Sequence, residues 1–462
     1  MQPLSESIFK QYDIRGIYPI DISEYTVKLI GYFLGVRIAK QKPNAKVCIG
    51  YDAREHSPQI LSWLCCGLND AQVQPYNMGL TATPVNYFSS FMGELSDTQM
   101  NASIMITASH NPKEYNGFKI TLGKRPFFGD AIQELKEDIK KAMSENRQIG
   151  SNDHCETIDI NSLYIDFITS KFAHLKTLDK RILLDSGNGC AGFIIQEIFD
   201  RLGLKTTHLF QEPDGSFPNH HPDPSKKENL QDVYKHLEAH DIAFAYDGDG
   251  DRLAVLTNKH EIKGDYLAIL FAKQMTNPTI IGEVKCSSVM YDEINKIGTA
   301  IMHKTGHSNI KEKLIETNAD MAAEVSGHLF FNDEYFGYDD AIYSTFRVLE
   351  LGTKIDIDDE LIALPHLHST DELQVSVSES HKFEIIANII AFIKENLDTI
   401  EPKITSIIEI DGLRCNFENG WALVRASNTT PCLVTRFEAN KELLTKQYQT
   451  LINSLITKYN HE

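Results

Sequence analysis

The chain has 462 residues, which predicts about three domains at roughly 150 residues each. Apolar residues make up 42% and charged residues 24%, a composition typical of a folded globular protein and too apolar for a disordered one. With 45 Lys and Arg against 64 Asp and Glu, the formal charge is −19, which argues against a nucleic-acid binder, against docking on anionic membranes and, taken alone, against an anionic substrate.

The N-terminal sequence MQPLSESIFKQYDIRG lacks the basic and apolar regions of a signal peptide. Eight cysteines are scattered without a C-x-x-C pair, as is typical of reduced thiols rather than of a disulfide frame or zinc site. The longest apolar runs, such as Leu267–Ala272, are far too short to span a membrane. We therefore expect a cytoplasmic protein and, since no apolar helix stands out as an interface, a monomer.

Three segments share one pattern, a short apolar run followed by a turn with Asp, Glu or Gly and then a helical pattern. They are Lys46–Arg54, Arg181–Cys190 and Thr279–Ser287. Each run is strand-length and does not alternate with polar residues, which predicts a strand buried on both faces. The spacing indicates three similar α/β units.

The first segment with candidate chemistry is Thr107–Pro112 (TASHNP), which follows the apolar run Ser103–Ile106. Ser109 stands where a strand gives way to a turn, so its hydroxyl can be exposed among backbone N–H groups. His110 and Lys119 can handle a proton and supply positive charge to a phosphate. The alternative is a plain turn, because Ser, Asn and Pro are turn formers. A serine hydrolase is disfavoured because G-x-S-x-G is absent.

The sharpest local signal is Asp247–Arg252 (DGDGDR), between the apolar runs Ile242–Tyr246 and Leu253–Leu256. Carboxylates at i, i+2 and i+4 in a loop can converge on one hard cation, and the glycines allow the backbone that convergence needs. Three carboxylates leave positions for a phosphate oxygen, as at Mg²⁺ sites of phosphoryl transfer. An EF-hand is disfavoured by Arg252 and Asn258 at positions that need Gly and Glu. A double Asp-Gly turn between strands is the structural alternative.

Glu324–His328 (EVSGH) is the third candidate segment. Glu324 and Ser326 at i and i+2 can point the same way and bind neighbouring hydroxyls of a sugar. The alternative is a strand end with a solvated glutamate.

The last 95 residues predict a different, α+β unit with an antiparallel sheet. The pattern begins with an alternating strand at Leu373–Val377 and a helix over Ile385–Ile393. Turns then follow at Asp411-Gly412 and Asn419-Gly420, and after them a strand at Leu433–Phe437 and a last helix that Asn440 can cap. Within it, Arg425–Pro431 (RASNTTP) combines a guanidinium with neutral donors and can hold a phosphate, or be only a polar loop. Boundaries near 153, 256 and 368 would give four domains, 1–152, 153–255, 256–367 and 368–462.

Together these four loops resemble the α-D-phosphohexomutase superfamily, in its bacterial phosphomannomutase/phosphoglucomutase branch, in both order and spacing. Three further stretches agree: Tyr12–Gly16 (YDIRG), Pro213–Pro222 (PDGSFPNHHP) and Lys304–Ser308 (KTGHS). One departure is Ala323, where the family usually has Gly before the glutamate of the sugar loop.

The resemblance implies a heart-shaped protein of three related α/β domains and a C-terminal α+β domain of the TATA-binding-protein type. It implies an isomerase that interconverts mannose or glucose 6-phosphate and 1-phosphate through a phosphoserine and a bound 1,6-bisphosphate, with Mg²⁺ as cofactor and glucose 1,6-bisphosphate as intermediate and activator. The implied metal site comprises Ser109, the phosphoserine, with Asp247, Asp249 and Asp251. The implied sugar and phosphate ligands are Glu324, Ser326, Arg425, Ser427, Asn428 and Thr429. The implied cleft residues are Tyr12, Arg15, His110, Lys119, Arg252, Lys285 and His307, among which His110, Lys119 and Arg252 would join Ser109 in catalysis.

Two alternatives to this function are weighed. A phosphoglucosamine mutase is expected to carry a polar residue where Val325 stands, and a non-catalytic sugar-bisphosphate sensor is disfavoured by the intact Ser109, aspartates and Arg252. Either His110 or Lys119 can be the general base. The resemblance also revises the argument from net charge, because cations gathered in one cleft can bind phosphosugars in an acidic protein.

Overall fold

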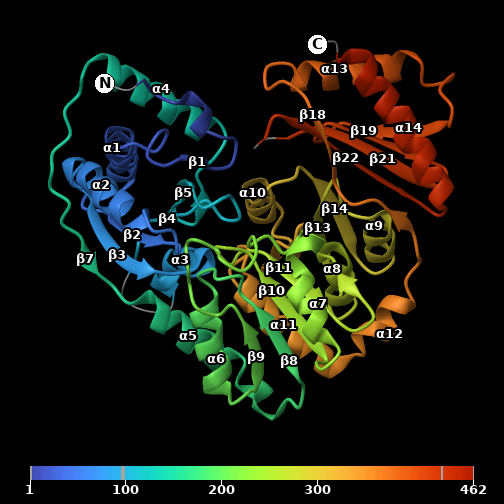
Figure 1. Cartoon of the computed structure of the whole chain (residues 1–462), viewed down its shortest axis with the longest axis horizontal. Helices are drawn as coiled ribbons and strands as arrows, with labels where there is room; N and C mark the ends of the chain where they lie inside the picture. Colours follow the sequence, from blue (N-terminus) through green and yellow to red (C-terminus); the bar gives the residue numbers. More distant parts are fainter. Residues whose placement is uncertain (1–2, 95–98, 428–429, 461–462) are drawn as a thin grey trace.

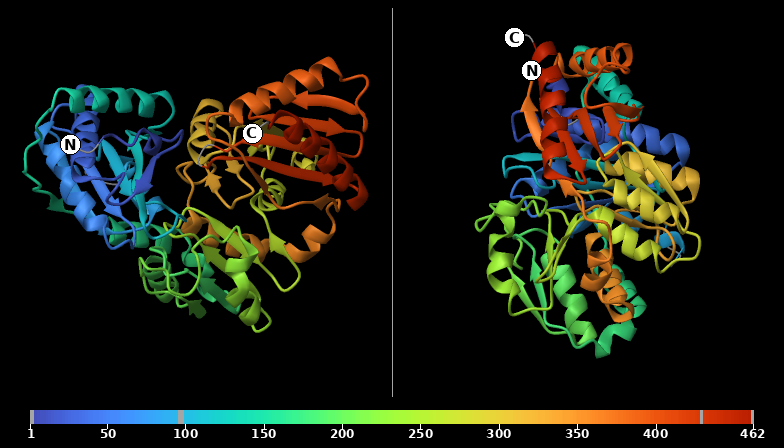
Figure 2. Two further views of the ribbon diagram at one scale, coloured as in Figure 1. Left: turned by 45° about the horizontal axis from the view of Figure 1, so that its top comes forward. Right: turned by 90° about the vertical axis from the view of Figure 1, so that its right-hand side faces the viewer.

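The computed structural model describes residues 3–94, 99–427 and 430–460. Figure 1 shows four units that follow one another around an arc, from the N-terminal unit in blue to the C-terminal unit in red. Each unit is built on its own sheet, and Figure 2 shows the first and last units on opposite sides of the middle two. The expected architecture of three α/β units and a C-terminal α+β unit is confirmed.

The first sheet has the strand order β1-β5-β4-β2-β3-β7, with β6 paired to β5. β2 is parallel to β3 and β4, and both faces of β2 and β4 are covered, as their unbroken apolar runs predict. The strands are β1 (Ile14–Ile17), β2 (Lys46–Tyr51), β3 (Gln74–Leu80), β4 (Ala102–Ile106), β5 (Tyr115–Leu122), β6 (Arg125–Pro126) and β7 (Glu156–Thr157). The helices are η1 (Glu6–Ile8), α1 (Glu24–Gln41), α2 (Ser57–Asp70), α3 (Thr83–Ser89), η2 (Met92–Glu94) and α4 (Asp130–Ser144).

The second sheet has the order β12-β11-β10-β8-β9, in which β8, β9 and β10 are parallel. β10 and β11 form an antiparallel pair with Tyr246 opposite Leu253, so the segment between them is a tight loop. The strands are β8 (Ile182–Asp185), β9 (Thr206–Leu209), β10 (Ile242–Tyr246), β11 (Leu253–Leu256) and β12 (Glu261–Ile262). The helices are α5 (Ile160–Lys171), η3 (Ala173–Thr177), α6 (Gly192–Leu202), η4 (Lys227–Leu230) and α7 (Gln231–Leu237).

The third sheet has the order β14-β13-β15-β16, with β13 parallel to β14 and β15. The Asp340 side chain caps α11 by accepting the N–H of Tyr343 at 2.8 Å. The strands are β13 (Thr279–Glu283), β14 (Thr299–His303), β15 (Met321–Ala323) and β16 (Leu329–Phe331). The helices are α8 (Gly264–Ala272), α9 (Ser288–Asn295), α10 (His307–Thr317), α11 (Ala341–Lys354) and α12 (Ile357–Ile362).

The fourth sheet is antiparallel, in the order β17-β22-β21-β20-β19 with β18 also paired to β22. Its strands are β17 (His368–Ser369), β18 (Leu373–Ser376), β19 (Ile404–Ile408), β20 (Leu413–Phe417), β21 (Gly420–Ala426) and β22 (Cys432–Ala439), and its helices are α13 (Lys382–Glu395) and α14 (Glu442–Tyr459). The expected cap of the last helix is wrong by one residue: Lys441, not Asn440, is the N-cap residue, and its side chain makes no capping hydrogen bond.

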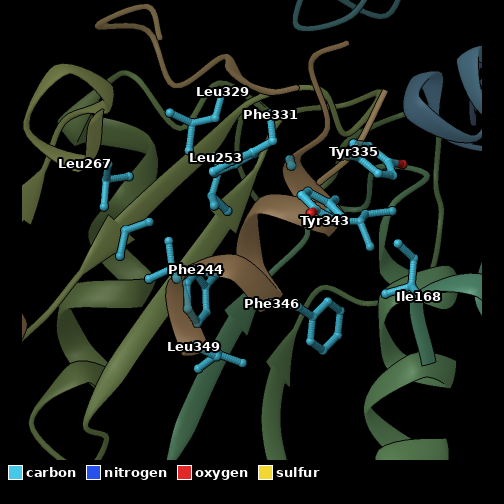
Figure 3. Packing of buried hydrophobic residues seen from close by; sticks show 14 of the residues in the cluster. Ile168, Phe244, Leu253, Leu267, Leu329, Phe331, Tyr335, Tyr343, Phe346 and Leu349 are labelled. Atoms are coloured by element: carbon cyan, nitrogen blue, oxygen red, sulfur yellow. The ribbon is translucent and has the colours of Figure 1, made fainter. Parts of the chain in front are cut away.

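One apolar core runs through the first three units, the first unit has a second core that includes residues of α1, α2 and α4, and the fourth has a core of its own under α13 and α14. Figure 3 shows Phe346 of α11 and Phe244 of β10 within the shared core. The domain boundaries given above stay predictions. β7 pairs with β3 and β12 pairs with β11, so these two short strands extend the first and second sheets to residues 157 and 262. Within the described ranges, no helix is long and apolar enough to cross a membrane.

Candidate active site

One cavity of about 500 Å³ is lined by residues of all four units. Twelve predicted site residues line it: Tyr12, Arg15, Ser109, His110, Lys119, Arg252, Lys285, His307, Glu324, Ser326, Arg425 and Ser427. The metal-loop aspartates, Asp247, Asp249 and Asp251, have no exposed surface and lie against it. Two further predicted residues, Asn428 and Thr429, lie outside the described residues.

Ser109 lies in the turn that follows β4. Its φ of +50° is a left-handed conformation, which costs energy for a residue with a Cβ and must be held by neighbours. Its N–H donates to Oγ1 of Thr107 at 2.8 Å, and its carbonyl accepts from Nη2 of Arg54 at 2.9 Å. Its Oγ donates to Oδ2 of Asp247 at 2.8 Å and lies 3.0 Å from Nδ1 of His110. The hydroxyl is therefore fixed against the metal loop.

Arg54 holds this turn from behind, and the sequence analysis missed it. Its guanidinium donates to the carbonyls of Pro112 and Asn111, both at 2.7 Å, and pairs with Asp52 at 3.1 Å. Asp52 in turn accepts from Oγ1 of Thr107 at 2.8 Å. The sequence does contain a sign of this role, since an Asp and an Arg come directly after a buried strand. Charged side chains that are buried at the end of a strand need partners of opposite charge.

The metal loop is folded around one carboxylate oxygen. Oδ1 of Asp247 accepts the backbone N–H groups of Gly250, Asp251 and Arg252, each at 3.1 Å. Gly250 adopts φ +76°, which glycine adopts without steric cost. The loop is thereby closed, with its three carboxylates on the inside.

The three aspartates form a donor set that fits a divalent cation. One oxygen of each lies within 4.8 Å of the others. Nζ of Lys119 donates to Oδ2 of Asp249 at 2.6 Å and also to Oδ2 of Asp251, but Oδ1 of both carboxylates is buried with no hydrogen-bond partner among the described residues. Unpartnered buried carboxylate oxygens are costly, and a hard cation is the partner that they fit.

Burial sets the protonation of these groups. It raises the pKa of the Asp247 carboxyl well above its ordinary value, and the two neighbouring aspartates raise it further. For Lys119 burial lowers the pKa, but the three aspartates outweigh burial and raise it overall. Burial, and then the charge of Arg252, holds the pKa of His110 well below its ordinary range, so its imidazole is neutral.

The third unit presents the predicted sugar-binding groups. Oε1 of Glu324, just after β15, accepts the N–H of Gly306 at 2.6 Å, which joins this loop to the one before α10. The hydroxyl of Tyr12 donates to the carbonyl of Thr305 at 2.8 Å, so the first unit contacts the same loop of the third unit. Nη1 of Arg15 donates to Oδ1 of Asn111 at 2.6 Å, beside the Ser109 turn.

Lys285, a predicted cleft residue, and Arg425, a predicted phosphate ligand, are each paired with a carboxylate. Nζ of Lys285 lies 2.6 Å from Glu372 and 3.4 Å from Glu283, and Nε of Arg425 lies 2.9 Å from Asp411. The Oγ atom of Ser427 accepts the N–H of Thr430 at 3.1 Å. These pairs keep buried cations in place before a phosphate binds.

His328 lines the same cavity, although the sequence analysis gave it no role. Its Nδ1 lies 2.9 Å from Oδ2 of Asp339, and its ring stacks with that of His307 at 5.8 Å between centroids. Burial lowers the pKa of His328, but Asp251 and Asp339 outweigh burial and raise it overall. The sequence indicated a role for His328 only through its position at the end of the EVSGH segment.

Comparison with known protein families gives four matches that follow the four sheets. Phosphoglucomutase/phosphomannomutase alpha/beta/alpha domain I matches residues 6–146, domain II matches 162–261, and domain III matches 263–362. The C-terminal domain of the same family matches residues 372–453.

Three similar proteins cover nearly the whole chain. The phosphomannomutase/phosphoglucomutase of Pseudomonas aeruginosa is 38% identical over 462 residues, 98% of this chain and 96% of that protein. The phosphoglucomutase of Neisseria gonorrhoeae is 37% identical over 473 residues, 100% of this chain and 99% of that protein. A crystal structure of a family protein from Burkholderia thailandensis matches with a TM-score of 0.86 and 35% identity, over 99% of this chain and 98% of that chain. The chain belongs to the phosphoglucomutase/phosphomannomutase family of enzymes.

Proposed function

We propose that this chain is a phosphomannomutase/phosphoglucomutase, which reversibly converts mannose or glucose 6-phosphate and 1-phosphate. The observation that carries this proposal is the place of Ser109. Its Oγ lies 2.8 Å from Asp247, beside carboxylate oxygens that fit a cation, in a cavity that Glu324 and Arg425 also line. The relatives support the two sugars, since proteins that share 37% and 38% identity with the chain carry these activities in their names.

Mg²⁺ is the proposed metal. Asp247, Asp249 and Asp251 would hold it together with an oxygen carried by Ser109. When bound, the ion would neutralise charge on the transferred phosphoryl group. Glucose 1,6-bisphosphate is the proposed intermediate and activator.

In the first half of the reaction, phosphorylated Ser109 donates its phosphoryl group to the free hydroxyl of the sugar phosphate. The bond between phosphorus and Ser109 Oγ breaks as the bond to the sugar oxygen forms, and the hydroxyl proton passes to a base. Lys119 and Arg252 lie where they offset the charge of the phosphoryl oxygens. Since Lys119 already donates to two carboxylates, the neutral ring of His110 and the ring of His328 are the groups better placed to exchange the proton.

In the second half, the bisphosphate turns end over end and Ser109 Oγ accepts its other phosphoryl group. The bond between phosphorus and the sugar oxygen breaks as the bond to Oγ forms, and the proton lost by Oγ passes through the base to the sugar oxygen. Glu324 and Ser326 would bind the hydroxyls at C3 and C4, which take similar places in both orientations. Lys285 and Arg425 would hold the phosphate that is not reacting. Because no residue in this scheme reads C2 strictly, both mannose and glucose fit.

Intact-protein mass spectrometry before and after incubation with glucose 6-phosphate tests this mechanism. We expect a phosphate-sized mass difference in the wild type and in Ser162→Ala, an exposed control, and none in Ser109→Ala. A Ser109→Ala enzyme with full mutase activity under bisphosphate supply would exclude the phosphoserine. A faster rate on glucosamine 1-phosphate than on mannose 1-phosphate would instead identify a phosphoglucosamine mutase.

The domain bounds, the oligomeric state and the cellular location are proposals that follow from the sequence. We propose a cytoplasmic monomer whose domains comprise residues 1–152, 153–255, 256–367 and 368–462, with phosphosugars as its binding partners. Size-exclusion chromatography with light scattering tests the monomer, and a mass twice that of the chain would contradict it.

A further inference from the structure

The loop that carries Lys285 is held by the C-terminal unit through its backbone. This loop leaves β13 and enters α9, and its three consecutive carbonyls all accept hydrogen bonds from arginines of the fourth sheet. Nη1 of Arg414 donates to the carbonyls of Val284 and Cys286 at 2.7 and 2.9 Å. Nη1 of Arg436 donates to the carbonyl of Lys285 itself at 2.6 Å.

The register of the sheet places the two arginines on one face, on the two strands that flank β21. Arg414 of β20 lies opposite Leu423 of β21, and Leu423 lies opposite Arg436 of β22. Trp421, two residues before Leu423 and on the same face, has the guanidinium of Arg414 over its ring at 3.9 Å. Leu423 and Trp421 pack with Val284, so this face of the sheet lies directly on the loop.

A buried carboxylate fastens the start of α9 to the same face. Oε1 of Glu438 accepts the N–H and the hydroxyl of Ser288, both at 2.9 Å, and the indole N–H of Trp421 at 2.7 Å. Its Oε2 accepts from the hydroxyl of Ser369 at 2.9 Å. Arg414, Arg436 and Glu438 are 2%, 6% and 0% exposed, so these charge-assisted bonds are shielded from water and hold the loop firmly.

The backbone and the ammonium group of Lys285 are therefore both bound by residues of the C-terminal unit or of the segment that leads into it. Its carbonyl is bound by Arg436, and its ammonium pairs with Glu372 of the segment that leads into the C-terminal unit. Arg425 lies on β21 two residues after Leu423, on the face that contacts the loop. The sheet thus fixes where Lys285 lies relative to Arg425.

We propose that Arg414 and Arg436 are positioning residues, which fasten the Lys285 loop to the C-terminal sheet so that Lys285 and Arg425 hold one substrate phosphate as a unit. This inference rests on the proposed function of Lys285 and Arg425 as phosphate ligands. Arg436 also lines the cavity, but its Nη1 is bound to the Lys285 carbonyl. We therefore assign both arginines an action through Lys285 and not on the reacting phosphoryl group, so their removal weakens substrate binding and leaves the chemical step nearly unchanged.

A double-mutant cycle on KM and kcat tests this proposal with glucose 1-phosphate as substrate. We expect Arg436→Met to raise KM about tenfold and to change kcat by less than about twofold. In the Lys285→Met background, the same Arg436→Met change should alter KM by less than about twofold, because the group that it positions is gone. An undiminished effect in that background would show that Arg436 acts on the substrate or on the fold, and would overturn the proposal.

Two control variants accompany the cycle. Arg436→Lys keeps one donor for the carbonyl, so KM should rise about two- to threefold. If Arg436→Met does not fold, this variant carries the cycle, and an unchanged KM would refute the proposal. Lys394→Met, an exposed change in α13, should leave both constants as in the wild type. The wild-type enzyme can interconvert the sugar phosphates even if the cycle shows no coupling between Arg436 and Lys285. That result would support the proposed function and refute the positioning role.

Discussion

Three cations of the cleft are held by carboxylates that the sequence did not pair with them. Lys119 contacts Asp249, Lys285 contacts Glu372, and Arg425 contacts Asp411. A buried cation without a partner would lose hydration with nothing in return, so these pairs let the cleft stay charged while it is folded. An incoming phosphate then finds the cations already in position.

Asp249→Ala is predicted to remain folded but to lose at least about 1,000-fold in turnover, because the metal that it helps to hold supplies several kcal/mol of charge stabilisation. Calorimetric titration with Mg²⁺ should show weakened or absent binding, and the melting temperature should stay near that of the wild type. Asp241→Asn, at a surface pair with Arg181, is the matched control. An unfolded Asp249→Ala protein would support the view that the loop is only a structural turn.

Glu372 is predicted to stabilise the protein at neutral pH and to lose that effect in acid. Burial opposes its ionisation, but the ammonium of Lys285 outweighs burial and lowers the pKa of Glu372 from 4.5 to about 2. A lowered folded-state pKa stabilises the fold above the unfolded value of 4.5, and this stabilisation disappears as pH falls from about 4.5 to about 2. Its side chain is 31% exposed, so solvent screening reduces the effect to about 1 kcal/mol.

Urea unfolding of Glu372→Gln and the wild type at several pH values measures this effect. At about pH 7 the variant should be less stable by about 1 kcal/mol, and the two curves should converge as the pH falls to about 2. A difference in stability that does not depend on pH would show that the carboxylate charge is not its source.

At the scale of elements, three of the reactive groups follow the ends of strands, whereas Lys119 lies within β5. Ser109 follows β4, the metal loop follows β10, and Glu324 follows β15. In an α/β sheet the loops after the strands face one side, where backbone and side chains are free of the core. The strands therefore act as supports whose packing fixes the loops.

Phe346→Ala is predicted to destabilise the fold by about 3–5 kcal/mol. Phe346 on α11 is fully buried, and its ring lies 4.9 Å from that of Phe199 and 5.5 Å from that of Phe172, so its removal leaves a cavity in the core shared by three units. The free energy of urea unfolding measures the loss. Phe383→Ala, at a side chain that is 60% exposed, should change stability by less than about 0.5 kcal/mol, and an equal loss in both variants would contradict this account.

At the scale of the whole molecule, the distribution of charge matters more than its sum. Lys and Arg residues outnumber Asp and Glu residues in the cavity lining by nine to six, whereas acidic residues outnumber basic ones in the chain by 64 to 45. Screening confines the effect of the acidic exterior to about 8 Å at physiological salt, so the local cations decide which ligands bind. An acidic protein can thus bind an anionic substrate.

The KM for glucose 1-phosphate is predicted to rise about three- to tenfold as ionic strength increases from about 0.01 to 0.5 M, because salt screens the attraction between the phosphate and the cavity lysines. Steady-state kinetics in NaCl measures this rise, with kcat changing much less. Sucrose at matched osmolality is the control and should leave KM unchanged. A KM that does not respond to salt would mean that hydrogen bonds, and not charge, dominate binding.

The sequence by itself determined the elements and the types of chemistry. Runs of apolar residues predicted the buried strands β2, β8 and β13, and Asp247–Arg252 predicted a cation-binding loop, because these properties depend on residues near one another in the chain. The position of the helix cap at residue 441 differed, since the choice between neighbouring cap residues depends on how the last strand ends.

The tertiary structure decided which distant groups meet. Arg54 binds the carbonyl of Ser109, and Arg436 binds the carbonyl of Lys285, so these bonds join residues far apart in the chain. Local spacing cannot predict such contacts, because a buried charge has many possible partners in a sequence and only the packed fold selects one. The net charge is a further example. The composition determines its value of −19, but only the folded structure places the cations around one cavity.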